Sequence, residues 1–332
     1  MSKIESAENK QKRVLVIDAL NMYFRSYIVD PSLSTNGQPI GGVKGFLKIL
    51  QKLIRETKPD EVIVAWDGQG GSRKKKTINK NYKEGRKPIR LNRDIRTLSE
   101  REELENKIWQ QTRLMEYLNE LPVIQLVLPE VEADDVISQV VQSHYYKGDQ
   151  KIIVSSDKDF FQLCDDETIL FRPVQKEVLN KNNILEKFGI HPTNFALARA
   201  VAGDKSDNLS GVPGVGLKSL AKRLPLLSME NAYDVNTLVS WCEEEQQKSN
   251  LKLFSNIVQN EDLIFENYKI MQLYCPSISV QGKKKINYAI ENFERQFNKT
   301  EFIRMMNEDG FGVFNWNDLF ANMKRMCLTK QH

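Results

Sequence analysis

The sequence contains few cysteines and histidines, and this excludes several kinds of site. Its 332 residues include four cysteines and three histidines. The cysteines are far apart in the chain, so they form neither a zinc cluster nor a disulfide framework, and they suit a reducing compartment. A catalytic triad or metal centre built on histidine is also disfavoured, because one of the three, His332, is the last residue.

Long apolar runs are absent as well. No stretch of about 18 apolar residues occurs, so we expect no membrane-spanning helix. The first residues, MSKIESAENKQKR, lack the apolar segment of a signal peptide. The composition, 40% hydrophobic and 28% charged, is that of an ordinary folded protein. We therefore expect a cytoplasmic protein, in the host cytoplasm if a bacteriophage encodes it.

One basic segment dominates the charge distribution. The net charge is only +4, yet residues 72–96 hold eleven basic and two acidic residues and one aromatic ring. Cations neutralise the phosphates of a nucleic-acid backbone, and an aromatic ring can stack on a base. This basic segment therefore predicts a nucleic-acid contact, with a solvated flexible loop as the alternative. The candidate contacts are Lys74, Lys75, Lys76, Lys80 and Tyr82.

Short apolar runs alternate with amphipathic stretches in the first half of the chain. Runs at 14–17, 61–66, 123–128 and 151–155 are typical of buried parallel strands, and residues 42–56, 99–121 and 132–143 have helical spacing. This alternation predicts an α/β fold with a central, mostly parallel sheet flanked by helices. After about residue 180 the pattern is helical.

Aspartates follow three of the predicted strands. Asp18 ends the first strand, Asp67 follows the second, and Asp157 and Asp159 follow the fourth. Open α/β sheets place functional sites at the carboxyl ends of their strands. A single aspartate in such a position more often caps the next helix, but three of them on one rim favour a site.

Five more carboxylates join this predicted rim. The sequence EADD contributes Glu132, Asp134 and Asp135, and GDKSDN contributes Asp204 and Asp207. Oxygen donors without cysteine or histidine suit Mg²⁺ or Mn²⁺. Nine carboxylates suit two ions about 4 Å apart, the arrangement that hydrolyses phosphodiesters. Calcium storage fits less well, because the donors come from five separate segments.

A glycine-rich turn follows these acidic residues. Gly211, Gly214 and Gly216 precede Lys218 in the stretch SGVPGVGLKSLA. Backbone amides at a helix N-terminus bind phosphate, so the turn predicts a contact to a nucleic-acid backbone. An ordinary turn between packed helices is the alternative.

Together these motifs resemble those of the 5′ nucleases. This family includes flap endonucleases, bacteriophage ribonuclease H, which is a 5′→3′ exonuclease, and the 5′-exonuclease domain of bacterial DNA polymerase I. The similar stretches occur in the family's order over roughly residues 12–225. They are VIDALNMYFR (16–25), VAWDG (64–68), YKEGRKP (82–88), VEADD (131–135), SSDKDFFQL (155–163) and GDKSDNLSGVPGVGLKSLA (203–221).

The resemblance implies a PIN-like 5′ nuclease core with added helical parts. Residues 1–11 would be a polar tail and 12–190 the nuclease core, with a basic arch at about 70–110. Residues 191–225 would form a helix–three-turn–helix that holds duplex, commonly with a bound K⁺. A helical C-terminal domain would occupy residues 226–332.

The resemblance also implies roles for individual residues. Lys83 and Arg86 of the arch would act on the scissile phosphate, and Arg25 would contact a phosphate behind the site. Asp135 matches an extra acidic position of phage and bacterial members. The first-metal group would be Asp18, Asp67, Glu132 and Asp134, and the second-metal group Asp157, Asp159, Asp204 and Asp207.

The implied activity is structure-specific 5′→3′ exonuclease and flap endonuclease cleavage with two Mg²⁺ or Mn²⁺, as in primer removal during DNA replication or repair. Branched or nicked DNA and RNA–DNA hybrids would be the substrates, and we expect a monomer. A non-cleaving branched-DNA-binding relative and an RNA-processing ribonuclease are the alternatives. Trp316, Leu319 and Phe320 could dock on a sliding clamp or single-strand-binding protein, or could belong to an ordinary packed terminal helix.

Overall fold

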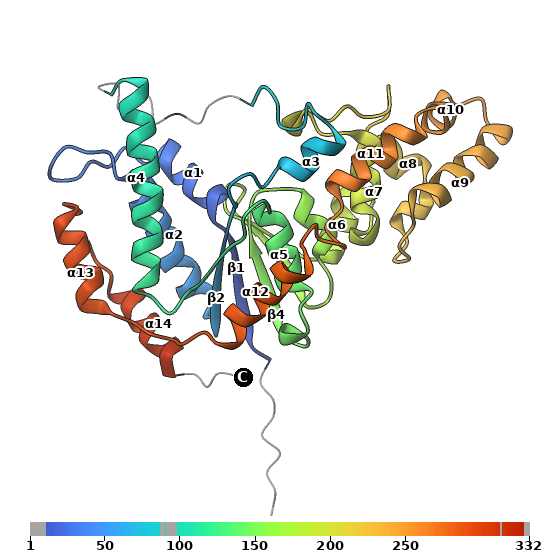
Figure 1. The fold of residues 1–332 in the computed structure, drawn as a ribbon. Helices are drawn as coiled ribbons and strands as arrows, with labels where there is room; N and C mark the ends of the chain where they lie inside the picture. The colour runs from blue at the N-terminus through green and yellow to red at the C-terminus, as the bar shows by residue number, and fades with distance from the viewer. Residues whose placement is uncertain (1–10, 87–89, 91–97, 313, 329–332) are drawn as a thin grey trace, which may run out of the picture.

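A six-stranded sheet forms the centre of the molecule (Figure 1). The computed structural model describes residues 11–86, 90, 98–312 and 314–328. The strand order is β3-β2-β1-β4-β5-β6, and all neighbours are parallel except β5 and β6. The strands are β1 (Arg13–Asp18), β2 (Glu61–Trp66), β3 (Ile124–Val127), β4 (Gln150–Val154), β5 (Thr168–Arg172) and β6 (Glu177–Leu179).

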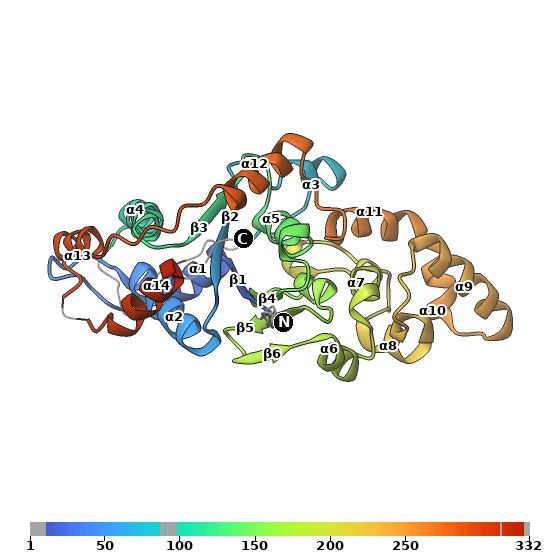
Figure 2. The ribbon, with the colours of Figure 1, turned by 90° about the horizontal axis from the view of Figure 1, so that it is seen from below.

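Helices cover both faces of this sheet, as the view from below shows (Figure 2). Those within or near the first half of the chain are α1 (Ala19–Val29), α2 (Gly41–Thr57), α3 (Arg73–Ile78), α4 (Glu100–Asn119), α5 (Ala133–Val141) and α6 (Lys181–Phe188). The remaining ones are α7 (Phe195–Ala202), α8 (Leu217–Arg223), α9 (Val235–Lys248), α10 (Lys252–Gln259), α11 (Glu261–Met271), α12 (Val280–Glu291), α13 (Lys299–Glu308) and α14 (Asn317–Leu328).

Alternate strand residues enter two separate hydrophobic cores. In β1, Val14 and Val16 belong to the core that contains α5, α7 and α9, whereas Leu15 and Ile17 belong to the core that contains α1, α2 and α14. Successive side chains of a strand point to opposite faces, and both faces of this sheet are covered, so the central part of β1 is a continuous apolar run. Burial of these runs is the main force that holds the strand ends in place.

The predicted α/β fold with a mostly parallel sheet is confirmed, and so are the first four strands and the helices α2, α4 and α5. The sequence did not indicate β5 and β6. In β5 the buried positions include Thr168 and Arg172, so polar residues interrupt the apolar face. β6 has only three residues, which is too short for a periodic signal.

Helix α4 does not bury all of its apolar side chains. Leu104 and Ile108 are 49% and 56% exposed. Only the C-terminal half of the helix packs on the sheet side, through Leu114 and Leu118. The helix begins at a capping box, in which Ser99 accepts from the backbone N–H of Glu102 and the Glu102 carboxylate accepts from Ser99.

The C-terminal helices return to the sheet. Helix α12 lies beside β3 and α5, and α14 packs on α2. Trp316 is 6% exposed and Leu319 is fully buried in the core around α2, with Phe320 packed against it. This packing fits the ordinary terminal helix that the sequence offered as the alternative, and docking on a sliding clamp or single-strand-binding protein stays a prediction.

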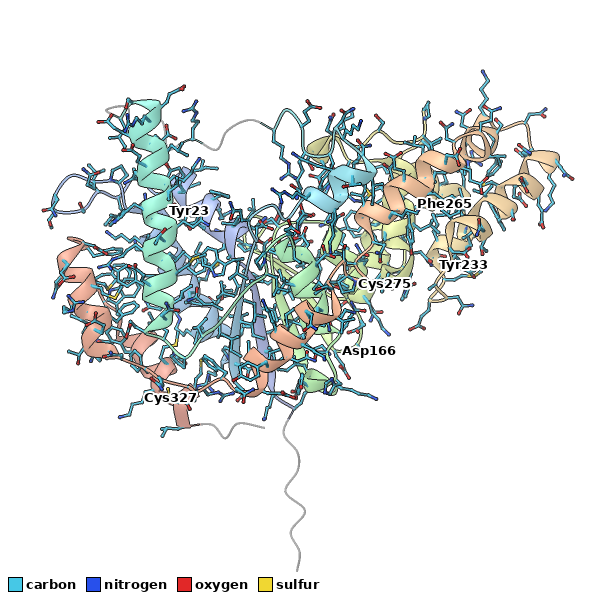
Figure 3. All side chains as sticks on the ribbon, in the orientation of Figure 1. Tyr23, Asp166, Tyr233, Phe265, Cys275 and Cys327 are labelled. Atoms are coloured by element: carbon cyan, nitrogen blue, oxygen red, sulfur yellow. The ribbon has the colours of Figure 1, made fainter. Side chains whose placement is uncertain are left out.

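The four cysteines are free, as their spacing predicted. Cys275 and Cys327, both labelled in Figure 3, lie on different parts of the molecule. Among the described residues, no helix combines the length and the apolar character that crossing a membrane requires.

A buried ion pair joins the C-terminal region to the sheet. Arg295 Nη2 lies 3.1 Å from Glu61 Oε2 at the start of β2, and the side chains are 6% and 13% exposed. Tyr146 donates to the other oxygen of the same carboxylate, and Arg295 also donates to the carbonyl of Met326 at 3.1 Å. These contacts tie three distant segments together.

We expect Arg295→Met to lower the free energy of unfolding by about 3 kcal/mol, because Glu61 would remain buried without its counter-charge. Arg55→Met is the matched control, since it breaks the Arg55–Asp318 pair, whose side chains are 54% and 52% exposed. That loss should stay below about 1 kcal/mol. Urea unfolding followed by circular dichroism measures both, and equal losses would contradict the role of the buried pair.

Candidate metal and nucleic-acid site

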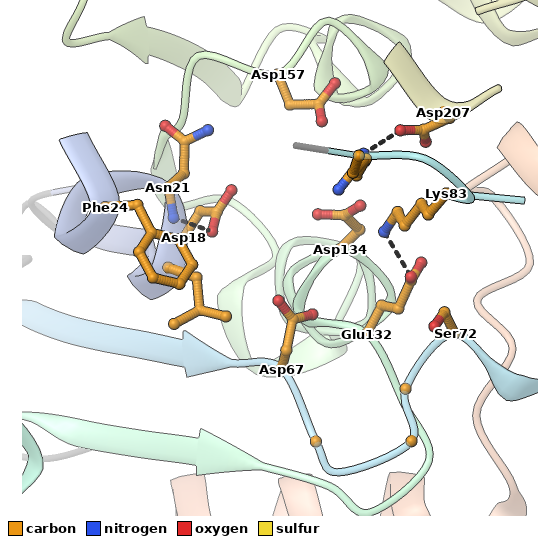
Figure 4. Close-up of a pocket in the computed structure, with 15 residues that line it drawn as sticks. Asp18, Asn21, Phe24, Asp67, Ser72, Lys83, Glu132, Asp134, Asp157 and Asp207 are labelled. Carbon is orange, nitrogen blue, oxygen red and sulfur yellow. Dashed lines mark hydrogen bonds and ion pairs between the residues drawn. The ribbon is translucent and has the colours of Figure 1, made fainter. Parts of the chain in front are cut away.

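Acidic side chains from separate segments line one cavity at the carboxyl edge of the sheet (Figure 4). The cavity has a volume of about 470 Å³ and lies over the ends of β1, β2 and β4 and the start of α5. Six of the nine predicted carboxylates line it, together with two cations, Lys83 and Arg86. These six are Asp18, Asp67, Glu132, Asp134, Asp157 and Asp207.

Asp18 both caps a helix and faces the cavity. Its carboxylate accepts from the backbone N–H of Asn21 at 3.1 Å, as an N-cap of α1, and from Ser155 Oγ at 2.8 Å. Burial, together with the charges of Asp67 and Asp157, outweighs the lowering effect of the two hydrogen bonds and raises the pKa of Asp18 to about 7. The capping and site interpretations of this residue are therefore compatible.

Asp134 lies beside the charge of Asp157 in the same cavity. Burial, and then the charge of Asp157, raise the pKa of Asp134 well above its ordinary value. Asp157 Oδ1 accepts from the backbone N–H of Asp159 at 2.9 Å, which orients it after β4. Asp67 is exposed and accepts from the backbone N–H of Ala133 at 2.8 Å. Buried carboxylates that repel one another favour a bound cation.

Glu132 is neutralised by two lysines of the basic segment. Lys75 Nζ lies 2.6 Å from Oε2 and Lys83 Nζ lies 2.5 Å from Oε1. Burial alone would raise the pKa of Glu132, but the two ammonium groups outweigh it and lower the pKa to about 2. Tyr82 donates to the same carboxylate at 3.2 Å.

The basic segment is also attached to the loop that carries Asp207. Arg86 pairs with the Asp207 carboxylate, and its Nε donates to the carbonyl of Ser206 at 3.1 Å. The backbone N–H of Lys83 donates to the Asp207 carbonyl at 2.8 Å. Lys83 has a φ of +57°, a conformation that non-glycine residues rarely adopt and that often marks functional sites.

Arg199 holds two of the predicted metal ligands that do not line the cavity. Its guanidinium lies 2.9 Å from Asp159 Oδ1 and also pairs with Asp204, and its side chain is only 8% exposed. Sequence reasoning missed this residue. A signal existed, because Arg199 is the one charged residue of the apolar helix α7, FALARAVA, and a buried arginine needs an acidic partner.

Asp135, the third predicted ligand outside the cavity, serves a different contact. It is 4% exposed, and its Oδ1 accepts from the backbone N–H of Ser277 at 2.7 Å. Asp135 therefore anchors the segment before α12 and does not face the other carboxylates.

The described residues contain no group of three or more Asp, Glu, His or Cys side chains close enough to hold a metal ion as they stand. The physical reason is that Lys75, Lys83, Arg86 and Arg199 draw carboxylates into ion pairs. The donor set still fits a hard divalent cation, because all donors that line the cavity are carboxylate oxygens and the pKa values of Asp18 and Asp134 are raised.

The comparisons with known proteins agree with this geometry. Residues 13–189 match the sequence model of a family described as 5′-3′ exonuclease, N-terminal resolvase-like domain. The chain belongs to the 5′-3′ exonuclease family. A 5′-3′ exonuclease of Aquifex aeolicus is 29% identical to this family member over 268 residues, which cover 79% of this chain and 82% of the relative.

Other relatives and solved structures extend the comparison. The DNA polymerase I of Caldicellulosiruptor bescii is 29% identical over 229 residues, which cover 67% of this chain and 25% of the polymerase. A bacteriophage T5 flap endonuclease, crystallised with DNA and metal ions, has a TM-score of 0.62 and 16% identity and covers 95% of this chain and 98% of its own. At this identity the likeness shows the fold alone.

In this exonuclease family member, the predicted nucleic-acid contacts of the basic segment differ in exposure. Lys74, Lys76 and Lys80 are exposed, as expected, and Lys74 Nζ donates to the carbonyl of Ser277 at 2.9 Å. Lys75 is 9% exposed and points to Glu132, so it does not present its charge outward. The part of the predicted arch at residues 87–89 and 91–97 lies outside the described residues.

The ring of Tyr82 does not lie where a base could stack on it. It is 2% exposed and packs in a small core with Leu209, Ile270 and Met271. Lys83 and Lys75 lie 5.0 and 5.8 Å from the ring centroid. The Tyr82 ring thus contacts the ammonium groups of Lys75 and Lys83 and is not available to a base. Arg25, the predicted phosphate contact behind the site, is half-buried on α1.

At the glycine turn the chain packs closely against its own backbone, and the contact to a nucleic-acid backbone stays a prediction. A Cβ on Gly211 would lie 2.1 Å from the carbonyl oxygen of Ala202, so only glycine fits there. Gly214 has a φ of +75° and faces open space, and Gly216 is the N-cap of α8. Lys218 is exposed on this short helix.

We expect Mg²⁺ or Mn²⁺ to raise the thermal midpoint, Tm, by about 2–6 °C, because a cation relieves repulsion among buried carboxylates. The pKa of Asp18 is raised in the folded state, so the metal-free protein should lose stability as the pH rises through about 7, and the ion should oppose this loss. Differential scanning fluorimetry with EDTA or metal measures the effect.

Asp134→Asn should raise the metal-free Tm and reduce the metal-dependent increase. The control is Asp166→Asn, an exposed aspartate that pairs with Lys181 and is labelled in Figure 3. If both variants responded to metal as the unmodified protein does, the cavity would not be the metal site.

Proposed function

We propose that this chain is a divalent-metal-dependent 5′ nuclease that hydrolyses phosphodiesters in branched or nicked DNA and in RNA–DNA hybrids. One observation carries the proposal: six carboxylates from five segments line a single cavity together with Lys83 and Arg86. Relatives named 5′-3′ exonuclease and a structural neighbour named a flap endonuclease support the same activity.

The cavity carboxylates would hold two ions, for which Mg²⁺ is our first choice and Mn²⁺ the alternative. Asp18, Asp67, Glu132 and Asp134 would serve one, and Asp157 and Asp207 the other. Bound divalent ions supply activation of a water and stabilisation of the charge on the leaving oxygen. Asp159 and Asp204 would act through their pairing with Arg199, which keeps α7 and the Asp207 loop beside β4.

Lys83 and Arg86 would neutralise the scissile phosphate. Each cation now offsets a carboxylate, Lys83 that of Glu132 and Arg86 that of Asp207. An entering phosphate offers both of them new oxygen partners within the same cavity. Charge that grows on the phosphate in the transition state would then be stabilised by groups already in place.

The substrate would be recognised by shape. The glycine turn and Lys218 would hold a duplex arm through its phosphates, with K⁺ as a candidate ion there, while Lys74, Lys76 and Lys80 would guide a strand toward the cavity. The non-cleaving alternative has less support, because six carboxylates and two cations share one cavity. The RNA-processing alternative leaves the glycine turn and the basic segment without a role.

The deciding experiment is a denaturing-gel assay on 5′-labelled substrates: a 5′ flap, a nicked RNA–DNA hybrid and a plain single strand. We expect short 5′ products from the first two with Mg²⁺ and none with EDTA. Tight flap binding without cleavage under Mg²⁺ or Mn²⁺ would instead favour the non-cleaving relative.

We expect Lys83→Ala to slow the single-turnover cleavage rate about 100-fold and to change flap affinity much less, because its ammonium acts inside the cavity. Lys80→Ala is the matched control from the same segment. Lys80 is exposed, so its loss should weaken binding and reduce the salt dependence while the rate at saturation is retained. If both variants lost affinity and rate equally, Lys83 would only tether the substrate.

Asp157→Asn should abolish cleavage, because Asp157 lines the cavity as a proposed metal ligand. Junction binding should survive, because the side chain carries no positive charge that could bind a phosphate. Gel assays and fluorescence anisotropy on the same flap would separate the two properties. Retained cleavage would show that the metals bind elsewhere.

A further inference from the structure

Helix α12 carries a basic surface that the proposed active site does not use. Lys283, Lys284 and Lys285 are consecutive in this helix, and none of their side chains forms an ion pair or hydrogen bond with another described residue. Lys284 and Lys285 are exposed, and Tyr288, one turn beyond Lys284, is 69% exposed. We call these four side chains the α12 surface.

The local sequence does nothing to offset this charge. Positions three and four residues before and after the lysines hold no carboxylate, so no acidic residue of the helix pairs with them. The lysines also lie in the first half of α12, where the helix dipole disfavours cations. Glu291, the one acidic residue of α12, lies at the far end and accepts from the hydroxyl of Tyr145. An uncompensated cluster of this kind suits a polyanion.

Two hydrogen bonds tie the segment before α12 to α5 and α3. Ser277, two residues before the N-cap Ser279, donates to Asp135 and accepts from Lys74 of the basic segment. Lys74 belongs to α3, so its hydrogen bond to Ser277 holds α3 to the segment that leads into α12. Lys285 lies six residues beyond the N-cap Ser279, about 9 Å along the helix axis from the start of α12.

The α12 surface lies at the opposite edge of the sheet from the glycine turn. Helix α12 contacts β3, whereas α6, which contacts β6, packs against α8 of the glycine turn. Six strands separate these edges by about 24 Å, and the cavity lies over the strands between them. A substrate with two arms that meets the cavity at its junction would reach one edge with each arm.

We propose that the α12 surface binds the phosphate backbone of the second arm of the substrate, the arm that the glycine turn does not hold. This inference rests on the proposed function and adds a second anchoring site to it. Lysines would neutralise phosphates, and Tyr288 would pack on the sugar or base edge. Recognition would depend on the presence of both arms and not on base sequence.

The test compares two triple variants by fluorescence anisotropy in EDTA, so that no cleavage occurs. One replaces Lys283, Lys284 and Lys285 with Gln, a good helix former. The control replaces the exposed lysines Lys52, Lys299 and Lys324 of α2, α13 and α14 with Gln and removes the same charge. The probes are a nicked duplex with two arms and a 5′-overhang duplex with one arm, each at several salt concentrations.

For the two-arm probe, the α12 variant should bind about tenfold or more weakly than the control variant at 0.1 M salt. The slope of log affinity against log salt should fall by about two. The one-arm probe should bind both variants alike. Equal affinities of the two variants for the two-arm probe would overturn the proposal, and equal losses on both probes would overturn the assignment to the second arm.

Failure of the proposed function would look different. In that case the unmodified protein would not cleave the flap with Mg²⁺ at all. If the unmodified protein cleaves and the α12 variant binds as the control does, only the α12 surface loses its role. Circular dichroism of both variants controls for folding.

Discussion

Repulsion among carboxylates at one edge of the sheet is the constraint on which the rest of the structure depends. Burial and neighbouring charges raise the pKa of Asp18 to about 7 and that of Asp134 well above its ordinary value. Such a cluster persists only with compensating charge. In this structure the compensation comes from cations of the chain itself, and Lys75 and Lys83 on Glu132 are the clearest example.

This compensation links the parts of the molecule that handle substrate. The basic segment is held over the cavity by the ion pairs of Lys75 and Lys83 with Glu132. Arg86 attaches the same segment to the loop of Asp207. Arg199 of α7 pairs with Asp159 and so attaches α7 to the loop after β4. The proposed metal donors, phosphate contacts and duplex-binding turn are thus coupled through ion pairs. Replacing any one charge is expected to disturb more than one function.

The rigid frame beneath this edge comes from apolar packing and from the C-terminal helices. Two cores hold the parallel strands, and α14 closes one of them against α2. The buried pair of Glu61 and Arg295 fastens the returning chain to the start of β2. Strand ends fixed in this way can hold like charges closer together than a flexible loop could.

Much of the fold followed from sequence patterns that local physics controls. Four apolar runs became β1 to β4, and Asp18, Asp67 and Asp157 lie at the strand ends where a parallel sheet brings them to one rim. Strands β5 and β6 were not predicted. Buried Thr168 and Arg172 break the apolar pattern of β5, and β6 has only three residues.

The sequence alone determined which charges this protein has and that Asp18, Asp67 and Asp157 follow strands whose ends meet at one sheet edge. Only the tertiary structure decided their partners. Asp135 accepts a hydrogen bond from Ser277. Asp159 and Asp204 pair with Arg199. Lys75 is buried in an ion pair with Glu132. The physical reason is that strand periodicity is local, whereas the partner of a buried charge depends on which distant segment packs beside it.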